Sequence, residues 1–145
     1  MSDLMSKLSI IMADTYALYL KTQNYHWHVR GAQFKSFHIL FEEQYRELAE
    51  AVDAIAERMI MLGHKAPATF REFEQLKTIK EGNSNLKSDD MVTELAKDNS
   101  TLVKDLNAAI SLAQKERDEG TVNLLADRLA AHQKAHWMLQ ASSEA

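Results

Sequence analysis

The segment NYHWHVRGAQFKSFHILFEEQYRELAEAVDAIAERMIMLG, residues 24–63, carries the main evidence for both architecture and chemistry. Its second part has the apolar spacing of a helix, on which His38 and Glu42 form one i,i+4 pair and Asp53 and Glu57 another. Eleven residues separate the pairs, close to three helical turns, so all four side chains point broadly the same way. At roughly 1.5 Å of rise per residue the pairs stand about 16 Å apart, too far for one metal ion to contact both.

Two copies of this helix, laid antiparallel about a twofold axis, would bring the two pairs together. Pairing His38 with Glu57 and pairing Glu42 with Asp53 give the same midpoint in the sequence. The sequence therefore predicts a metal site shared between two subunits. A plainer reading stays open, because helical Asp and Glu are usually solvated and a single His is more often structural than a ligand.

The composition is that of a single globular domain over residues 1–145, with 46% hydrophobic and 26% charged residues. One proline and four glycines favour long helices. The chain has no cysteine, which excludes thiolate sites and fits a cytoplasmic location. We expect no signal peptide and no membrane segment. The net charge of −4 does not favour a general nucleic-acid binder.

Helical periodicity predicts four long helices and one short helix between the second and third. Their expected ranges are 2–29, 35–62, 70–76, 88–117 and 121–140. We expect Gly63 to end the second helix, Ser88 to cap the third, and Gly120 to separate the last two. Because the connection over 64–87 is long, the fold class predicted is all-α, a ferritin-like four-helix bundle with a short extra helix in the crossover.

The helix over 35–62 divides into three faces. The candidate ligands lie beside the apolar stripe rather than within it, which suits a subunit interface better than a site inside one bundle. The apolar stripe consists of Phe37, Leu48, Val52, Ile55, Met59 and Leu62. On the far side of the candidate ligands lies an acidic stripe, which consists of Glu43, Glu47 and Glu50.

Residues 24–63 resemble the Dps family, the DNA-binding proteins from starved cells, which are mini-ferritins. The spacing H-x11-H-x3-E-x10-D-x3-E, with Trp27 after the first His, carries the resemblance, and residues 118–139 show a weaker likeness. The family implies a homo-oligomer, a shell of twelve subunits built from twofold dimers, with a ferroxidase centre across each dimer twofold. Carried over, the metal ligands are His26, His38 and Glu42 of one subunit and Asp53 and Glu57 of its partner.

The resemblance implies an enzyme that oxidises Fe(II) to Fe(III), using hydrogen peroxide more readily than dioxygen, and stores the ferric mineral. Imidazole and carboxylate ligands suit iron, and zinc is a possible substitute. Trp27 is a candidate catalytic residue for electron transfer or radical scavenging, or else a packing residue of the interface. His28 stands where Asn is frequent, and we expect a hydrogen bond there rather than a ligand.

Other residues carry weaker expectations. The acidic stripe is a candidate for mineral nucleation or an ordinary solvated face, and His132 with His136 is an i,i+4 pair with no evident third ligand. The family's acidic threefold pores correspond to Asp118, Glu119 and Asp127, with Asn123 where an Asp is frequent.

Two other functions compete with this interpretation of the sequence. A nucleoid-binding protein with little iron turnover is the alternative, but the ends have few basic residues and finish in ASSEA, so we predict weak or no DNA binding. A ferritin with its site inside one bundle would need Glu-x-x-His motifs, and the sequence has none.

Overall fold

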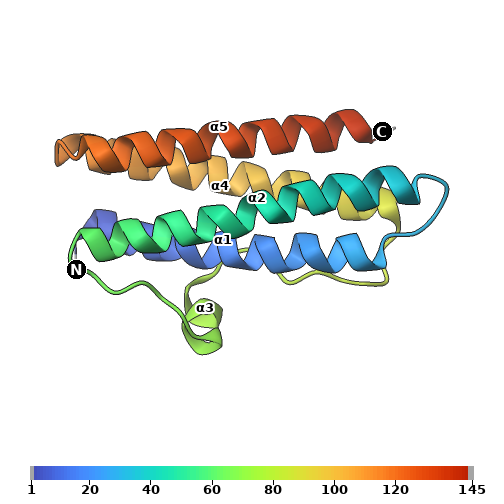
Figure 1. Cartoon of the computed structure of the whole chain (residues 1–145), viewed down its shortest axis with the longest axis horizontal. Helices are drawn as coiled ribbons and strands as arrows, with labels where there is room; N and C mark the ends of the chain where they lie inside the picture. Colours follow the sequence, from blue (N-terminus) through green and yellow to red (C-terminus); the bar gives the residue numbers. More distant parts are fainter. Residues whose placement is uncertain (1, 144–145) are drawn as a thin grey trace.

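The computed structural model describes residues 2–143 and places them in a bundle of four long helices with one short helix outside it (Figure 1). No strand occurs within those residues, so the predicted fold class is confirmed. All four long helices and the short one lie close to the predicted ranges. The helices are α1 (Asp3–His28), α2 (Phe34–Met61), α3 (Phe70–Leu76), α4 (Ser88–Lys115) and α5 (Glu119–Ser142).

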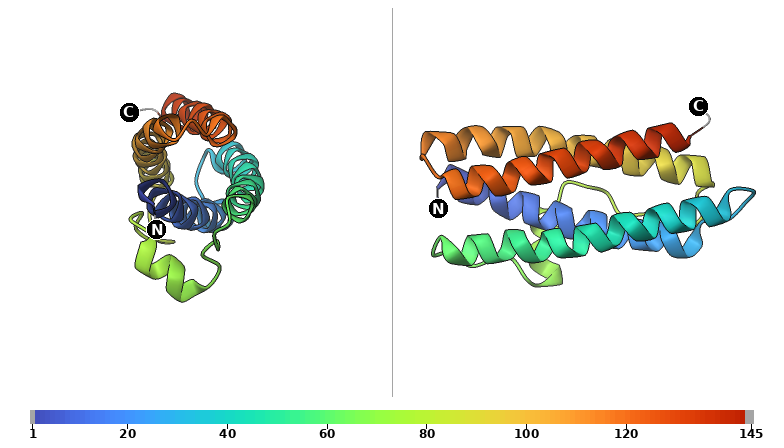
Figure 2. Two further views of the ribbon diagram at one scale, coloured as in Figure 1. Left: turned by 90° about the vertical axis from the view of Figure 1, so that its left-hand side faces the viewer. Right: turned by 45° about the horizontal axis from the view of Figure 1, so that its top comes forward.

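The bundle consists of two antiparallel hairpins, α1 with α2 and α4 with α5, joined by a long crossover. After α2 the chain returns along the bundle before α4 begins, so α2 and α4 run in the same direction (Figure 1). The end-on view shows the four long helices around a common axis and α3 outside them (Figure 2). This arrangement confirms the predicted crossover topology.

Buried polar contacts attach the crossover to α1. The carboxylate of Asp14, fully buried, accepts hydrogen bonds from the backbone N–H groups of Thr78 and Ile79 and from the Thr78 hydroxyl, at 2.7–3.0 Å. The Tyr25 hydroxyl accepts from the N–H of Asn83 at 3.1 Å. Because these backbone groups would otherwise be unsatisfied, the contacts fix the path of the crossover.

Two helix ends differ from the sequence prediction. The cap position of α4 is Lys87, and Ser88 is already helical; no side chain caps this end, although Asp89 and Asp90 favour the helix dipole. The break before α5 lies at Arg117, which has φ of 55°, whereas Gly120 is inside α5.

Gly120 is required for packing rather than for a turn. A Cβ atom there would lie 2.6 Å from the Arg58 guanidinium, which is held by Asp118 and Thr121. By contrast, Gly63 acts as predicted at the end of α2: its φ is 85°, and the N–H of His64 bonds back to the carbonyl of Met59.

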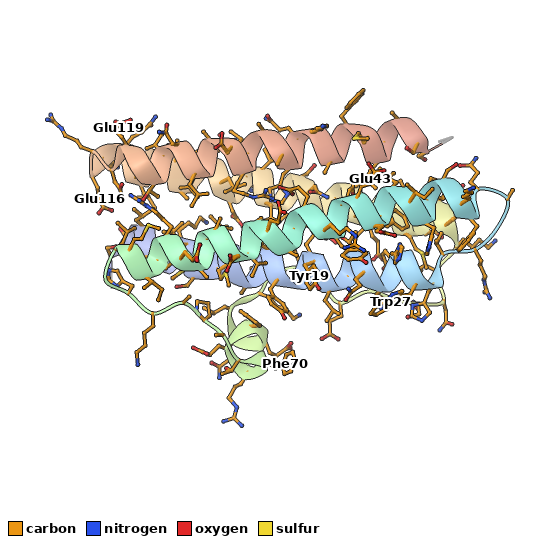
Figure 3. The ribbon with its side chains drawn as sticks, viewed as in Figure 1. Tyr19, Trp27, Glu43, Phe70, Glu116 and Glu119 are labelled. Carbon is orange, nitrogen blue, oxygen red and sulfur yellow. The ribbon has the colours of Figure 1, made fainter. Side chains whose placement is uncertain are left out.

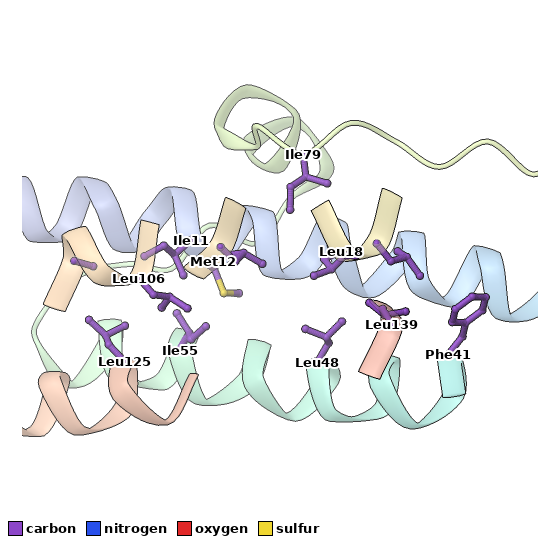
Figure 4. Close-up of a cluster of buried hydrophobic side chains, with 14 of the residues drawn as sticks. Ile11, Met12, Leu18, Phe41, Leu48, Ile55, Ile79, Leu106, Leu125 and Leu139 are labelled. Carbon is purple, nitrogen blue, oxygen red and sulfur yellow. The ribbon is translucent and has the colours of Figure 1, made fainter. Parts of the chain in front are cut away.

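A cluster of buried aliphatic, aromatic and methionine side chains forms the hydrophobic core along the bundle axis (Figure 4). The predicted apolar stripe of α2 faces it: Phe37, Leu48, Ile55 and Met59 are buried, and the other two members are partly buried against the cluster. None of the helices over residues 2–143 combines the length and the hydropathy of a membrane span. Of the ASSEA end, Glu144 and Ala145 lie outside the described residues.

Candidate metal centre

Three of the five predicted ligands converge at one end of the α1–α2 hairpin. His26 comes from the last turns of α1, and His38 and Glu42 come from the first turns of α2. One ligand atom from each lies within 4.8 Å of the others, and this is the one such group found within residues 2–143. The two imidazole rings are stacked, with centroids 3.9 Å apart and planes 13° apart.

Reciprocal hydrogen bonds hold the two histidines. Nδ1 of His26 lies 2.7 Å from the carbonyl oxygen of His38, and Nδ1 of His38 lies 2.7 Å from the carbonyl oxygen of His26. Since a carbonyl only accepts, each Nδ1 carries the proton and donates it. In the neutral ring this leaves the lone pair on Nε2, the form in which a histidine binds a metal.

Glu42 completes the cluster, and its two carboxylate oxygens face different residues. Its Oε1 lies 3.8 Å from Nε2 of His26, while its Oε2 accepts a hydrogen bond of 3.0 Å from Nε of Arg46. His26 is buried, whereas His38 and Glu42 are half-buried. The cluster is thus open to solvent on one side, where further ligands can approach.

Aromatic side chains surround the two imidazoles. The Phe34 ring stacks against His38 with centroids 4.9 Å apart, and the Tyr45 ring meets His26 edge-on at 5.2 Å. These contacts restrict ring rotation, so the imidazoles are oriented before any ion binds.

Asp53 and Glu57 do not join this cluster within one chain. Both are exposed on α2, and neither belongs to the group of ligand atoms around His26. Completion of the site by a second copy of the chain stays a prediction.

The two residues after His26 point elsewhere. Trp27 is 59% exposed near the end of α1 (Figure 3), and its ring makes no aromatic contact within residues 2–143. Nδ1 of His28 lies 2.8 Å from the carbonyl oxygen of Asn24, and His28 is not part of the metal group. His28 therefore makes the expected hydrogen bond, and the role of Trp27 stays a prediction.

His132 and His136 do not form a metal pair in this structure. Nδ1 of buried His132 donates to Oδ1 of Asn99 at 2.8 Å, and its Nε2 accepts from Arg128 at 2.8 Å. Burial and the Arg128 charge lower the pKa of His132 to about 3, so its ring is neutral. Nδ1 of His136 bonds to the carbonyl of Ala96. Both histidines thus serve structural hydrogen bonds.

One member of the acidic stripe of α2 is engaged in an ion pair. Glu47 forms an ion pair with buried Arg128, while Glu43 and Glu50 are exposed. Glu43 and Glu47 line a cavity of about 350 Å³ between α2 and α5. Mineral nucleation there stays a prediction.

Among the predicted pore residues, Asp118 stabilises the start of α5. It caps α5 and pairs with Arg58 at 2.8 Å. Desolvation opposes its charge, but hydrogen bonds from Thr121 and Arg58 outweigh that effect and lower the pKa of Asp118. Glu119 and Asp127 are exposed, as is Asn123.

The sequence reasoning missed two neighbours of the metal cluster, Arg46 and Tyr45. The i,i+4 spacing from Glu42 to Arg46 is a usual signal for a helical ion pair. Tyr45 lies seven residues after His38, two turns along the same face, and so could have been placed beside the ligands.

Comparison with known proteins agrees with this architecture. The family model described as ferritin-like domain matches residues 5–144. The chain is 36% identical to the DNA protection during starvation protein of Helicobacter pylori over 135 residues, 92% of this chain and 94% of that protein. Antigen TpF1 of Treponema pallidum superposes with a TM-score of 0.94 at 35% identity, covering 98% of this chain and 92% of that one. The Dps protein of Vibrio cholerae superposes with a TM-score of 0.91 at 30% identity, covering 95% and 87%. The chain therefore belongs to the ferritin-like domain family and, within it, to the Dps proteins.

Proposed function

We propose that this Dps protein is a ferroxidase and iron-storage shell. It oxidises Fe(II) with hydrogen peroxide at a site shared by two subunits and retains the ferric product as mineral, which protects against oxidative damage. The observation that carries the proposal is the convergence of two imidazoles and one carboxylate at a half-open position. Such a ligand set with open positions suits non-haem Fe(II).

The geometry of the cluster fits an iron ion as substrate. Two ligands that each lie about 2 Å from a metal are at most about 4 Å apart, and Nε2 of His26 lies 3.8 Å from Oε1 of Glu42. The Vibrio cholerae relative is described as a member of a broad superfamily of ferritin-like diiron-carboxylate proteins, which supports iron as the metal. Zinc, with overlapping ligand preferences, would serve as a redox-inert competitor.

The partner subunit supplies the remaining ligands in this proposal. Asp53 and Glu57 are exposed on α2 and free of ion pairs within residues 2–143, so they are available to a neighbouring copy. A twofold dimer would then hold two equivalent sites, and six such dimers would form the twelve-subunit shell.

Subunit mixing tests the shared site. Asp53→Asn and His38→Ala oligomers should each lose peroxide-driven Fe(II) oxidation. After dissociation and co-assembly in equal amounts, half the dimers are hybrids, and each hybrid contains one intact site. Activity should therefore return to about one quarter of the wild-type level, as twofold symmetry requires.

A matched variant controls for the loss of an exposed carboxylate. Glu116→Gln changes a carboxylate at the end of α4, outside the cluster and the acidic stripe, and should leave oxidation unchanged. If subunit exchange is confirmed by mass spectrometry and the mixture stays inactive, the ligands are not shared and the proposed site is wrong.

A further inference from the structure

Aromatic rings run in continuous contact from the candidate metal centre along the α1–α2 hairpin. The His26 ring meets Tyr45 with centroids 5.2 Å apart, Tyr45 meets Tyr19 at 6.0 Å, and Tyr19 meets Tyr16 at 5.6 Å. All three contacts are edge-on, with planes 65–75° apart. These separations are typical of directly contacting aromatic pairs.

The chain of rings crosses between helices and ends at the short helix. Tyr45 belongs to α2, while Tyr19 and Tyr16 belong to α1 one turn apart. Tyr16 then stacks on Phe73 of α3, with centroids 4.6 Å apart and planes 21° apart. Figure 3 shows Tyr19 on the part of α1 that lies above α3 in this view. Since phenylalanine is far harder to oxidise than tyrosine, redox chemistry along the path would stop at Tyr16.

We propose that Tyr45, Tyr19 and Tyr16 form a relay that draws one-electron oxidising equivalents away from the metal ligands. The relay rests on the proposed ferroxidase function. It matters when a site holds a single Fe(II), because hydrogen peroxide needs two electrons for reduction to water and one Fe(II) supplies only one. The missing electron would otherwise leave a hydroxyl radical beside His26 and His38.

The balance of the step is complete. One electron from Fe(II), one electron and one proton from the Tyr45 phenol, and one proton from solvent convert hydrogen peroxide to two molecules of water. The products are Fe(III) and the neutral Tyr45 phenoxyl radical. Tyr19 then returns an electron and a proton to Tyr45, and Tyr16 does the same for Tyr19, so the radical comes to rest on Tyr16.

The surroundings of the phenols suit this chemistry. All three tyrosines are half-buried, so protons can exchange with water while the rings stay packed. The guanidinium of Arg46 lies 5.6 Å from the centre of the Tyr45 ring. A cation over the ring disfavours a second positive charge there, so that oxidation of Tyr45 is coupled to loss of its proton.

The fourth tyrosine of the chain provides a matched control. Tyr25 directly precedes His26, yet it is fully buried, and its hydroxyl donates to Glu94 at 2.6 Å. Its ring makes no aromatic contact within residues 2–143. Tyr25→Phe therefore removes a phenol hydroxyl outside the relay, and the same substitution at Tyr45, Tyr19 or Tyr16 removes one within it.

The test combines freeze-quench electron paramagnetic resonance with peptide mass spectrometry. Assembled oligomers receive one Fe(II) per predicted site and then hydrogen peroxide. Wild type and Tyr25→Phe should give the same tyrosyl signal. Tyr45→Phe should lose most of it and gain oxidation products on His26, while Tyr16→Phe should keep the signal with an altered hyperfine pattern, because the radical then stays on Tyr19.

The outcomes separate the relay from the ferroxidase proposal. If Fe(II) is consumed and Tyr45→Phe keeps the full signal, or Tyr25→Phe loses it, the relay is wrong and the ferroxidase proposal stands. If wild-type protein consumes no Fe(II) with peroxide, both proposals are wrong, because the oxidant of the relay is never formed at the site.

Discussion

Arg46 lies one helical turn after Glu42 on α2, and its Nε donates a 3.0 Å hydrogen bond to Oε2 of that carboxylate. The other oxygen of Glu42 faces His26. The Glu42 hydrogen bond raises the pKa of Arg46, which therefore stays charged. A fixed positive charge thus sits beside the position where a divalent cation would bind.

We predict that Arg46→Gln tightens divalent metal binding. The substitution frees Oε2 of Glu42 and removes a repulsive charge, and for an exposed pair the gain is up to about fivefold in affinity. Calorimetric titration with Zn(II) at low salt measures it, and added salt should reduce the difference because it screens the guanidinium.

Arg71→Gln is the matched control, since Arg71 is exposed on α3, away from the cluster. Weaker Zn(II) binding by Arg46→Gln would mean that Arg46 serves mainly to orient Glu42, and the competition described here would be wrong.

The second prediction concerns the hydrogen bonds between His26 and His38. The carbonyl of His26 lies in the last turn of α1, where carbonyls lack helical partners, and Nδ1 of His38 satisfies it. His38→Ala should lower the free energy of unfolding by about 2–3 kcal/mol, from one lost hydrogen bond and two lost ring stacks, with His26 and with Phe34. Urea unfolding at fixed protein concentration measures this change.

His28→Ala removes an exposed imidazole from the neighbouring turn and should change stability little. Equal effects of the two substitutions would show that the His26–His38 contacts contribute nothing to the fold.

The sequence alone predicted the elements whose signals are local and repeated. The apolar stripe of α2 follows from helical periodicity, and the short α3 follows from a brief apolar pattern inside a long connection. Gly120 was misread because its role depends on Arg58, a residue from another helix that no local pattern reveals. Similarly, Tyr19 reaches Tyr45 only through the packing of α1 on α2, which periodicity does not specify residue by residue.

The ligand cluster likewise combines residues that a local pattern predicts with residues placed by contacts between helices. His38 and Glu42 could be paired from their spacing on one helix, whereas His26 was assigned as a ligand through the family resemblance, because its approach depends on how α1 ends and α2 begins. Arg128 lies four residues before His132 on α5, so helical spacing could have paired them, whereas Asn99 comes from α4 and no local pattern places it beside His132.

The third prediction is a pH dependence from His132. Its pKa is about 3 in the folded state against 6.5 as the ordinary value, so below about pH 6.5 the unfolded chain binds a proton that the folded chain does not. The stabilisation is therefore complete above pH 6.5 and is lost as the pH falls towards 3. The slope is at most about 1.4 kcal/mol per pH unit.

His132→Gln should flatten this dependence, because a glutamine amide can still donate to Asn99 and accept from Arg128 but does not titrate. Unfolding free energies at several pH values from about 7 to about 5 test it, with exposed His28→Gln as the control. An unchanged slope in the His132 variant would contradict the assignment of a neutral, buried ring.

The last prediction concerns the attachment of the crossover to α1 through Asp14. The carboxylate is fully buried and satisfies two backbone N–H groups and one hydroxyl of Thr78 and Ile79. Asp14→Ala leaves these donors without a partner in the interior, and should cost about 3 kcal/mol. Asp14→Asn should cost less, because its carbonyl oxygen can still accept from both N–H groups while its amide faces the Thr78 hydroxyl, which can turn to accept.

Hydrogen exchange distinguishes local from global effects of Asp14→Ala. The amides of Thr78 and Ile79 should lose protection in this variant before those of the buried turns of α4 do. Uniform loss of protection across the bundle would show instead that Asp14 supports the whole core and does not specifically fix the crossover.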